Sequence, residues 1–399
     1  MKKSRFIYIS ILFVLFASTL LLISCKKESE NTVKIGLLHS TTGSMAFSEQ
    51  SVLNAELMAI DEINKAGGVL GCQIQVIQEN GESDPTVFAK KAEKLITEDK
   101  VVSIFGCWTS DSRKAVKNVV EEHYNLLWYP VQYEGMEASP NIMYMGACPN
   151  QQVVPAVDFC VKTFGKRVYL LGSDYSFPQI ANKIIKAQLK ELGAVCVQEK
   201  YVPLDETQFH SIISDIKQLK PDVIINTLNG DSNISFFTQF NNMGLTAKDY
   251  PIMSFSIAEN EIAEIGVENV KGHYVSWNYF ETLETSKNMR FVSMYRQIYG
   301  EDAHVGDPVE AGYLAVYLWA AACEKAGSFD IEAVRIASKD LRFIGPEGMV
   351  TIEHSNQHLN KVIRIGQVNS KGQITQIWAS DEPVRPDPYL STYAWARGL

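Results

Sequence analysis

The sequence predicts an α/β protein made of two similar doubly wound lobes. From residue 33 onward, short apolar runs rich in β-branched residues alternate with segments of helical periodicity, which is typical of parallel β/α units. This alternation passes through two successive cycles. After residue 281 the pattern changes to three helices followed by strand-like runs, which indicates that the chain crosses back into the first lobe and then returns to the second.

Each cycle is expected to contain four strands with helices between them. The first helix carries Leu53, Leu57 and Ile60 at helical spacing and stops at Gly67-Gly68. The strands of the first cycle are expected at residues 33–38, 74–78, 101–105 and 126–129. Those of the second cycle are expected at residues 168–171, 195–199, 222–227 and 252–255.

The C-terminal third supplies parts of both lobes. Its helices are expected at residues 287–299, 308–325 and 331–341, and its strands at 349–352, 362–368 and 374–378. We expect the chain to cross between the lobes at residues 147–152, 278–280 and 345–348. Lobe 1 then combines residues 33–150 with 281–346, and lobe 2 combines 151–280 with 347–399. Three crossings make a hinge, which suits a clamp that closes on a small ligand.

The N-terminus has the features of an export signal. Lys2, Lys3 and Arg5 precede an almost wholly apolar stretch, residues 6–23. The next residues, Leu22-Ile23-Ser24-Cys25, resemble the lipobox of bacterial lipoproteins, in which the cysteine is lipid-modified and becomes the new N-terminus. We therefore expect a signal peptide at 1–25, lipidation at Cys25 and a polar tether at 26–32. The alternative is an uncleaved membrane anchor, and either interpretation places the folded part outside the cytoplasm, tethered to a membrane.

Composition limits the class of partner. The 399 residues carry a formal net charge of -9, without the basic face that a nucleic-acid partner would need. Six cysteines remain besides Cys25, and their irregular spacing supports neither a zinc site nor a redox motif. Export permits disulfides, but the sequence leaves their pairing open.

Polar and aromatic residues follow the predicted strands, at the edge of an open α/β sheet where ligands bind. Hydroxyls and loop N–H groups can donate to a carbonyl, and carboxylates or amide oxygens can accept from NH₂ groups. Each residue also has a structural alternative, as a helix cap or a core aromatic. Without a phosphate loop or an Arg/Lys cluster, the ligand is expected to be small and neutral or zwitterionic. The candidate ligand-binding residues are Trp108, Thr109, Ser110, Tyr129, Gln132, Asp174, Tyr175, Asp231, Ser256 and Glu259.

Two catalytic alternatives were considered. Cys107 follows a strand and could be the nucleophile of an exported amidohydrolase, although no His or Lys is identifiable as its partner. His354 and His358 are four residues apart, but Ser355-Asn356 indicate a turn, which disfavours a metal site. We expect neither a metal nor a cofactor.

Several blocks of the sequence are long and unusual. They are Gly106-Cys107-Trp108-Thr109-Ser110 with Ser112-Arg113-Lys114, the run from Tyr129 to Gly135, Pro149-Asn150-Gln151-Gln152, Gly172-Ser173-Asp174-Tyr175, and Asn229-Gly230-Asp231-Ser232-Asn233. These blocks resemble the urea-binding lipoproteins of bacterial urea ABC transporters. The resemblance covers about residues 33–386 and implies a type I periplasmic-binding-protein fold. Amide-sensing regulators and branched-chain amino-acid binders look like more distant relatives.

The resemblance implies site residues and partners. In the related amide binders the positions that match Ser110, Tyr129 and Tyr175 line the pocket. Trp108-Thr109 and Gln132 fit the urea-binder pattern, so we assign them the choice of urea over larger amides as a hypothesis. Phe177 departs from the relatives, which often have tyrosine there.

The implied function is therefore that of a binding protein that captures urea outside the cytoplasmic membrane, at the periplasmic side or the cell surface, and delivers it to an ABC permease. The alternatives are binding of a short-chain amide or a branched-chain amino acid, and the amidohydrolase.

Overall fold

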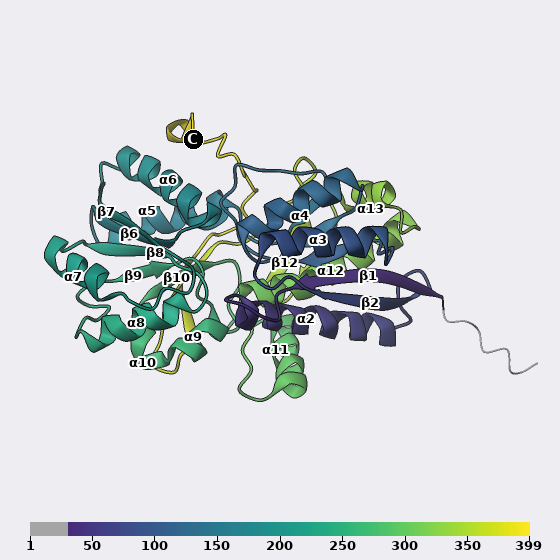
Figure 1. Cartoon of the computed structure of the whole chain (residues 1–399), viewed down its shortest axis with the longest axis horizontal. Helices are drawn as coiled ribbons and strands as arrows, with labels where there is room; N and C mark the ends of the chain where they lie inside the picture. The colour runs from purple at the N-terminus through teal and green to yellow at the C-terminus, as the bar shows by residue number, and fades with distance from the viewer. Residues whose placement is uncertain (1–30) are drawn as a thin grey trace, which may run out of the picture.

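The computed structural model describes residues 31–399, which form two lobes lying side by side (Figure 1). The centre of lobe 1 is a five-stranded sheet in the order β2-β1-β3-β4-β5, and every pair in it is parallel. Helices cover both faces, which is why strands β3, β4 and β5 are wholly buried apolar runs. The elements are β1 (Thr32–His39), α2 (Ala46–Lys65), β2 (Gln73–Asn80), α3 (Pro85–Thr97), β3 (Ile104–Gly106), α4 (Ser110–Glu122), β4 (Leu127–Tyr129) and β5 (Ile142–Tyr144).

Lobe 2 is organised around a seven-stranded sheet in the order β15-β14-β10-β9-β8-β6-β7. Five of its strands run parallel, and β14 and β15 are added antiparallel at one edge. The helices are α5 (Val153–Thr163), α6 (Ser176–Glu191), α7 (His210–Leu219), α8 (Ser232–Asn242), α9 (Glu259–Ile265) and α10 (Val267–Val270). The strands are β6 (Arg167–Ser173), β7 (Val195–Val202), β8 (Val223–Thr227), β9 (Ile252–Ser254), β10 (Tyr274–Trp277), β14 (Arg364–Val368) and β15 (Ile374–Ala379).

Between these segments the chain returns to lobe 1. Three helices and a small antiparallel sheet pack there, and Val350, Ile352 and Leu359 share a core cluster with Val33 and Leu314. These elements are α11 (Ser286–Tyr299), α12 (Asp307–Ala326), α13 (Ile331–Ser338), β11 (Arg342–Gly345), β12 (Gly348–Ile352) and β13 (Leu359–Asn360).

The third crossing differs from the one expected from the sequence. Residues 345–348 form the turn of a hairpin in which Gly345 of β11 pairs with Gly348 of β12, so they stay in lobe 1. The chain leaves lobe 1 only after β13, and β14 opens its second passage through lobe 2. A turn bounded by glycines is compatible with a hairpin within lobe 1 and with a crossing between the lobes. Only the antiparallel pairing of β11 with β12 distinguishes these two geometries.

One side chain links the three crossings. Asn278, in the second crossing, donates through Nδ2 to the carbonyl oxygen of Gln151 in the first, at 3.3 Å, and to that of Val362 in the third, at 3.0 Å. The backbone N–H groups of Asn278 and Tyr279 both donate to Asp307 Oδ2, at 2.9 and 2.8 Å. The hinge is therefore held by hydrogen bonds between its own strands.

The C-terminal tail also contacts both lobes. The carbonyl oxygen of Pro388 accepts a hydrogen bond of 2.8 Å from the N–H of Met136 in lobe 1. Two residues later Leu390 is buried in the core of lobe 2, in the same cluster as Phe177. Figure 1 shows this tail in yellow, and the short helix η2 (Ala394–Ala396) lies near α6.

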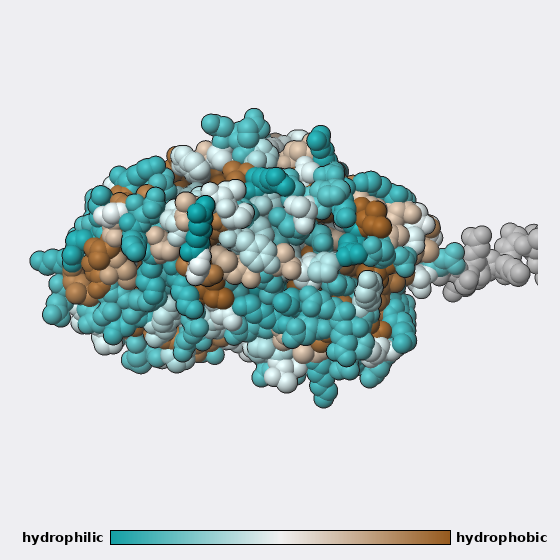
Figure 2. All heavy atoms as spheres, turned by 90° about the horizontal axis from the view of Figure 1, so that it is seen from above, coloured by the Kyte–Doolittle hydropathy of each residue, from teal (hydrophilic) through white to brown (hydrophobic). Residues whose placement is uncertain are grey.

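The visible surface is mainly hydrophilic, with hydrophobic side chains in separate small groups (Figure 2). Within residues 31–399, no helix has the length and apolar character needed to cross a membrane. The six cysteines of this part of the chain are all unpaired. The predicted signal peptide, Cys25 and most of the tether lie outside the described residues.

Candidate functional site

The predicted ligand-binding residues sit where the two sheets face each other. Trp108, Thr109 and Ser110 follow β3, and Tyr129 ends β4, with Gln132 just beyond it. In lobe 2, Asp174 and Tyr175 follow β6, Asp231 follows β8, and Ser256 follows β9. Because the strands are parallel, their carboxyl ends meet at one edge of each sheet.

Direct hydrogen bonds cross between the lobes at this edge. The indole Nε1 of Trp108 donates to Asn229 Oδ1 at 3.2 Å, and Gln132 Nε2 donates to the carbonyl oxygen of Phe255 at 2.8 Å. Gln132 Nε2 also lies 3.4 Å from Ser256 Oγ. Elsewhere in the interface between the lobes, Ser48 Oγ of lobe 1 donates to Glu261 Oε1 of lobe 2 at 2.7 Å. The lobes are therefore in a closed arrangement.

Asn229 connects most of this set, although the sequence did not single it out as a ligand residue. Its Nδ2 donates to the hydroxyl of Tyr175 at 2.7 Å and to Ser256 Oγ at 3.0 Å, while its Oδ1 accepts from Trp108. Asn229 lies two residues after the end of β8, as the predicted site residues follow their strands, and that position is the signal that could have identified it.

The side chains that meet around Asn229 form a buried, uncharged cluster, whereas the carboxylate of Glu261 meets Ser48 elsewhere between the lobes. Gln132 is 4% exposed, Asn229 2% and Ser256 3%. Among the residues described, Gln132 Oε1 has no hydrogen-bond partner. A buried amide oxygen without a partner is costly, so this atom is suited to accept a hydrogen bond from a ligand N–H.

The start of α4 offers donors beside them. Thr109 caps the helix, because its Oγ1 accepts from the N–H of Ser112 at 3.1 Å. The N–H groups of Ser110 and Asp111 have no protein acceptor within residues 31–399. A helix N-terminus with free N–H groups can bind an anion or a carbonyl oxygen.

The hydroxyl of Ser110 is used within lobe 1. It donates to Glu134 and accepts from Arg113 at 3.1 Å. The buried guanidinium of Arg113 also reaches Glu134 Oε1 at 3.1 Å and Glu137 Oε1 at 2.9 Å. Its carbon Cζ lies 5.1 Å from the ring centre of Tyr129, whose hydroxyl donates to the carbonyl oxygen of Trp108 at 2.7 Å. This network fixes the start of α4 and the backbone of Trp108.

Electrostatic attraction keeps the network charged. Burial acts to raise the pKa of Glu134, but Arg113, Lys114 and the hydrogen bond from Ser110 hold that pKa below its usual value. The same attraction, led by Glu134, outweighs the burial of Arg113 and raises the pKa of the guanidinium. A charged pair with several hydrogen bonds is the form in which a buried ion pair is tolerated.

Three of the predicted acidic residues do not join the uncharged cluster. Asp174 is exposed and accepts from Gln179 Nε2 at 2.6 Å, and Asp231 is exposed at the start of α8 without capping it. Glu259 is buried near the hinge, where its Oε1 accepts from the N–H of Glu281 at 2.8 Å. Burial and repulsion from Glu281 raise the pKa of Glu259 well above its usual value.

Cys107 has the environment of a core residue. It is fully buried, and this burial raises the pKa of its thiol well above the usual value. The nearby His39 is engaged by Glu56, with 2.9 Å between Nε2 and Oε2. A thiol that stays protonated is a poor nucleophile.

His354 and His358, the two histidines that could have formed a metal site, contact different residues. His354 Nδ1 lies 2.9 Å from Asp340 Oδ2, and the buried ring of His358 stacks on Tyr144. In the described part of the chain, no group of three or more His, Cys, Asp or Glu residues could hold a metal ion.

Together the fold and this edge define a two-lobed α/β binding protein that closes around its solute. The family model described as a periplasmic binding protein domain matches residues 33–394, so the chain belongs to this family. Its fold confirms the prediction from the sequence, and family membership implies a location outside the cytoplasm.

Curated relatives include binding proteins and one enzyme. Leu/Ile/Val-binding protein homolog 6 of Brucella melitensis biotype 1 is 20% identical over 346 residues, which are 85% of this chain and 88% of that protein. Limonene hydroxylase of Geobacillus stearothermophilus is 30% identical over 127 residues, which are 32% of this chain. The chain thus spans only 23% of the length of that enzyme.

Among solved structures, a solute-binding protein of an ABC transporter from Rhodopseudomonas palustris BisB5, in complex with 3,4-dihydroxybenzoic acid, is similar. Its TM-score is 0.80 at 22% sequence identity, and the match covers 89% of this chain and 98% of that chain. At this identity the similarity shows the fold.

Proposed function

We propose that this protein is the solute-binding component of an ABC importer and that its ligand is a small neutral amide, with urea as the first candidate. The observation that carries the choice of ligand is the uncharged cluster between the lobes, in which Gln132 Oε1 is a buried acceptor without a partner among residues 31–399. Urea carries N–H donors and one carbonyl oxygen, and no net charge that would need an ion pair.

The polar groups at the carboxyl ends of the strands suggest how such a ligand is bound. An N–H group of urea would donate to Gln132 Oε1, and the urea carbonyl would accept from the free N–H groups of Ser110 and Asp111 at the start of α4. The rings of Trp108 and Tyr175 would exclude water from these hydrogen bonds and so strengthen them. The direct contact of Trp108 with Asn229 favours a small solute, because a large one would have to break it.

Lobe closure would couple binding to transport. A ligand shifts the protein toward the closed state only by its differential affinity for that state. Trp108 and Gln132 can hydrogen-bond to lobe 2 only when the lobes are closed. The closed form is therefore the one with a complete solute-binding site. A membrane permease that recognises this form would receive the solute. We further propose that a lipid on Cys25 tethers the protein to the membrane.

A second candidate is an amino acid or another organic acid, which the name of the Brucella relative and the ligand of the Rhodopseudomonas protein suggest. The free N–H groups at the start of α4 favour it, since they can bind a carboxylate. An α-amino acid would also need an acidic partner for its ammonium group; the cluster around Asn229 has none, and the interlobe carboxylate of Glu261 already accepts from Ser48 and Asn260.

An enzyme is the third interpretation. The limonene hydroxylase match spans a third of this chain, and an amidohydrolase would need Cys107 as its nucleophile. The raised pKa and complete burial of Cys107 oppose nucleophilic catalysis, so we propose binding without turnover.

The test is calorimetric titration of the purified protein with urea, acetamide, leucine and 3,4-dihydroxybenzoate, followed by an assay for released ammonia. The proposal expects saturable heat with urea, weaker binding of acetamide and no ammonia. Binding of leucine or 3,4-dihydroxybenzoate with no response to urea would keep the binding function and overturn the ligand. Ammonia release that disappears in Cys107→Ala would overturn the non-enzymatic assignment.

A further inference from the structure

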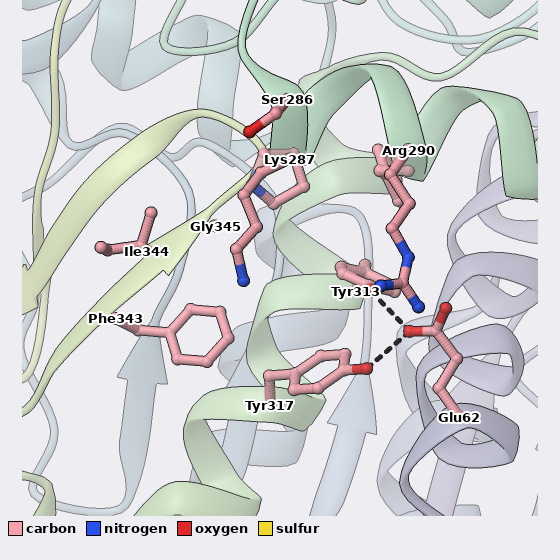
Figure 3. A pocket seen from close by; sticks show the side chains of 11 residues that line it. Glu62, Ser286, Lys287, Arg290, Tyr313, Tyr317, Phe343, Ile344 and Gly345 are labelled. Carbon is pink, nitrogen blue, oxygen red and sulfur yellow. Dashed lines mark hydrogen bonds between the residues drawn. The ribbon is translucent and has the colours of Figure 1, made fainter. Parts of the chain in front are cut away.

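Lobe 1 contains a cavity of about 370 Å³, away from the edge where the lobes meet. It lies between α2, α11, α12 and β11, and all of its lining residues belong to lobe 1. Figure 3 shows Lys287 and Arg290 extending from α11 toward the space that Glu62, Tyr317 and Phe343 face. Its volume is within the range of small-molecule sites, roughly 300–1,000 Å³.

One end of the cavity carries a negative charge between aromatic rings. Glu62 Oε2 accepts from the hydroxyl of Tyr313 at 2.6 Å and from that of Tyr317 at 2.5 Å (Figure 3). The other oxygen, Oε1, is buried and has no hydrogen-bond partner among the residues described. A carboxylate oxygen flanked by tyrosine rings can bind a cationic nitrogen, because the ring faces add cation–π attraction.

Positive charge lines the same cavity, on Lys287 and Arg290. Lys287 Nζ lies 6.0 Å from the ring centre of Phe343, and Arg290 donates through Nε only to Met294 Sδ, at 3.4 Å. Within residues 31–399, neither cation has a carboxylate within ion-pair distance, Glu62 included. Both residues are exposed, so their charged groups can bind a carboxylate.

We infer that this cavity binds a small zwitterion, an α-amino acid with an apolar or aromatic side chain. A simple anion would meet the carboxylate of Glu62, and a simple cation would meet Lys287 and Arg290. A zwitterion satisfies both signs of charge, with its ammonium group at Glu62 and its carboxylate at the two cations. The rings of Tyr317 and Phe343, with centroids 5.6 Å apart, offer an apolar wall for the side chain.

This site is independent of the proposed solute site between the lobes. The two would differ in chemistry, since the interlobe cluster is uncharged and this cavity carries both signs of charge. Binding of an amino acid here would leave the binding of urea in place.

The test uses L-phenylalanine as the probe in calorimetric titrations of the purified protein. Two analogues each lack one charged end: phenylalaninamide has no carboxylate, and 3-phenylpropanoate has no ammonium group. We expect phenylalanine to bind and each analogue to bind roughly tenfold or more weakly, as for loss of a charge-assisted hydrogen bond.

Variants locate the binding site. Glu62→Gln keeps an acceptor for both tyrosines and removes the charge, and Arg290→Ala changes an exposed side chain, so both should fold. Each should weaken phenylalanine binding roughly tenfold while the affinity for urea stays unchanged. Glu93→Gln, on the exposed face of α3, is the matched control and should change neither affinity. Absence of phenylalanine binding would overturn the inference. So would binding that Trp108→Ala abolishes and Glu62→Gln leaves intact, since the probe would then occupy the site between the lobes.

Discussion

The indole Nε1 of Trp108 donates to Asn229 Oδ1 across 3.2 Å and so joins lobe 1 to lobe 2. Each residue lies two positions after the end of a strand of a central sheet, and both are buried. The backbone of Trp108 is itself fixed, because its carbonyl oxygen accepts from the hydroxyl of Tyr129 at 2.7 Å. The contact therefore reports on closure of the lobes.

Trp108→Phe should weaken urea binding by about threefold to tenfold, because it removes one hydrogen bond of the closed state and keeps an aromatic ring. Calorimetric titration with urea measures the effect. The matched control is Trp128→Phe, in the core of lobe 1, where the indole N–H has no partner within the described residues. Equal affinities for urea in wild type and Trp108→Phe would mean that this contact does not contribute to ligand-bound closure.

Ser110→Ala should lower the free energy of unfolding by about 1–3 kcal/mol, because it removes the buried hydroxyl that Glu134 Oε2 and Arg113 Nη1 contact. Guanidinium chloride is the denaturant of choice, since urea is the proposed ligand. Ser286→Ala, at an exposed position that begins α11, should have no such effect. Unchanged stability in Ser110→Ala would contradict the network, and an unchanged affinity for urea would remove its hydroxyl from the ligand contacts.

His39 should make stability depend on pH. Burial acts to lower its pKa, but attraction to Glu56 and hydrogen bonds with Glu49 and Glu56 outweigh burial and raise the pKa from 6.5 to about 10. A pKa that is raised on folding stabilises the protein fully below about 6.5, and this stabilisation is lost as pH rises toward about 10.

Guanidinium unfolding at pH 6.5 and pH 9.5 tests this prediction. The loss of stability between the two pH values should be smaller in His39→Gln and in Glu56→Gln than in wild type. His210→Gln, an exposed histidine at the start of α7, is the control and should keep the wild-type dependence. The same pH dependence in His39→Gln as in wild type would contradict the assigned role of the buried pair.

The tail should stabilise lobe 2 through Leu390, which is 1% exposed in the core that also contains Phe177. Leu390→Ala should cost about 2–5 kcal/mol of unfolding free energy, as for other buried leucines. Leu399→Ala is the comparison, because Leu399 is 46% exposed and should tolerate the change. If the two variants were equally stable, the tail would not be part of the folded core.

The β/α alternation was sufficient to predict the two-lobed fold, because buried parallel strands such as β3 and β8 are continuous apolar runs. It could not place the third crossing. In the sequence, residues 345–348 have the pattern of a linker. Whether β12 pairs with β11 or continues into lobe 2 depends on the tertiary contacts of Val350 and Ile352.

Within the site, the sequence predicted which loops would meet but not which atoms. Trp108, Gln132, Tyr175 and Ser256 converge because parallel strands end at one edge. Asn229 belongs to a block that resembles the urea-binding lipoproteins, but the sequence did not assign it to the ligand, since an amide after a strand can equally cap the next helix. For Asp231 the pattern could not separate an exposed carboxylate from a ligand contact.

The central claim is that uncharged side chains between the lobes bind urea, and titration of urea into wild type and Asn229→Ala tests it most directly. Asn229→Ala removes the contacts to Trp108, Tyr175 and Ser256 together. We expect saturable binding in wild type, a loss of roughly tenfold or more in affinity in the variant, and no ammonia from either. No heat from urea with wild type, or equal affinity in both proteins, would contradict the account.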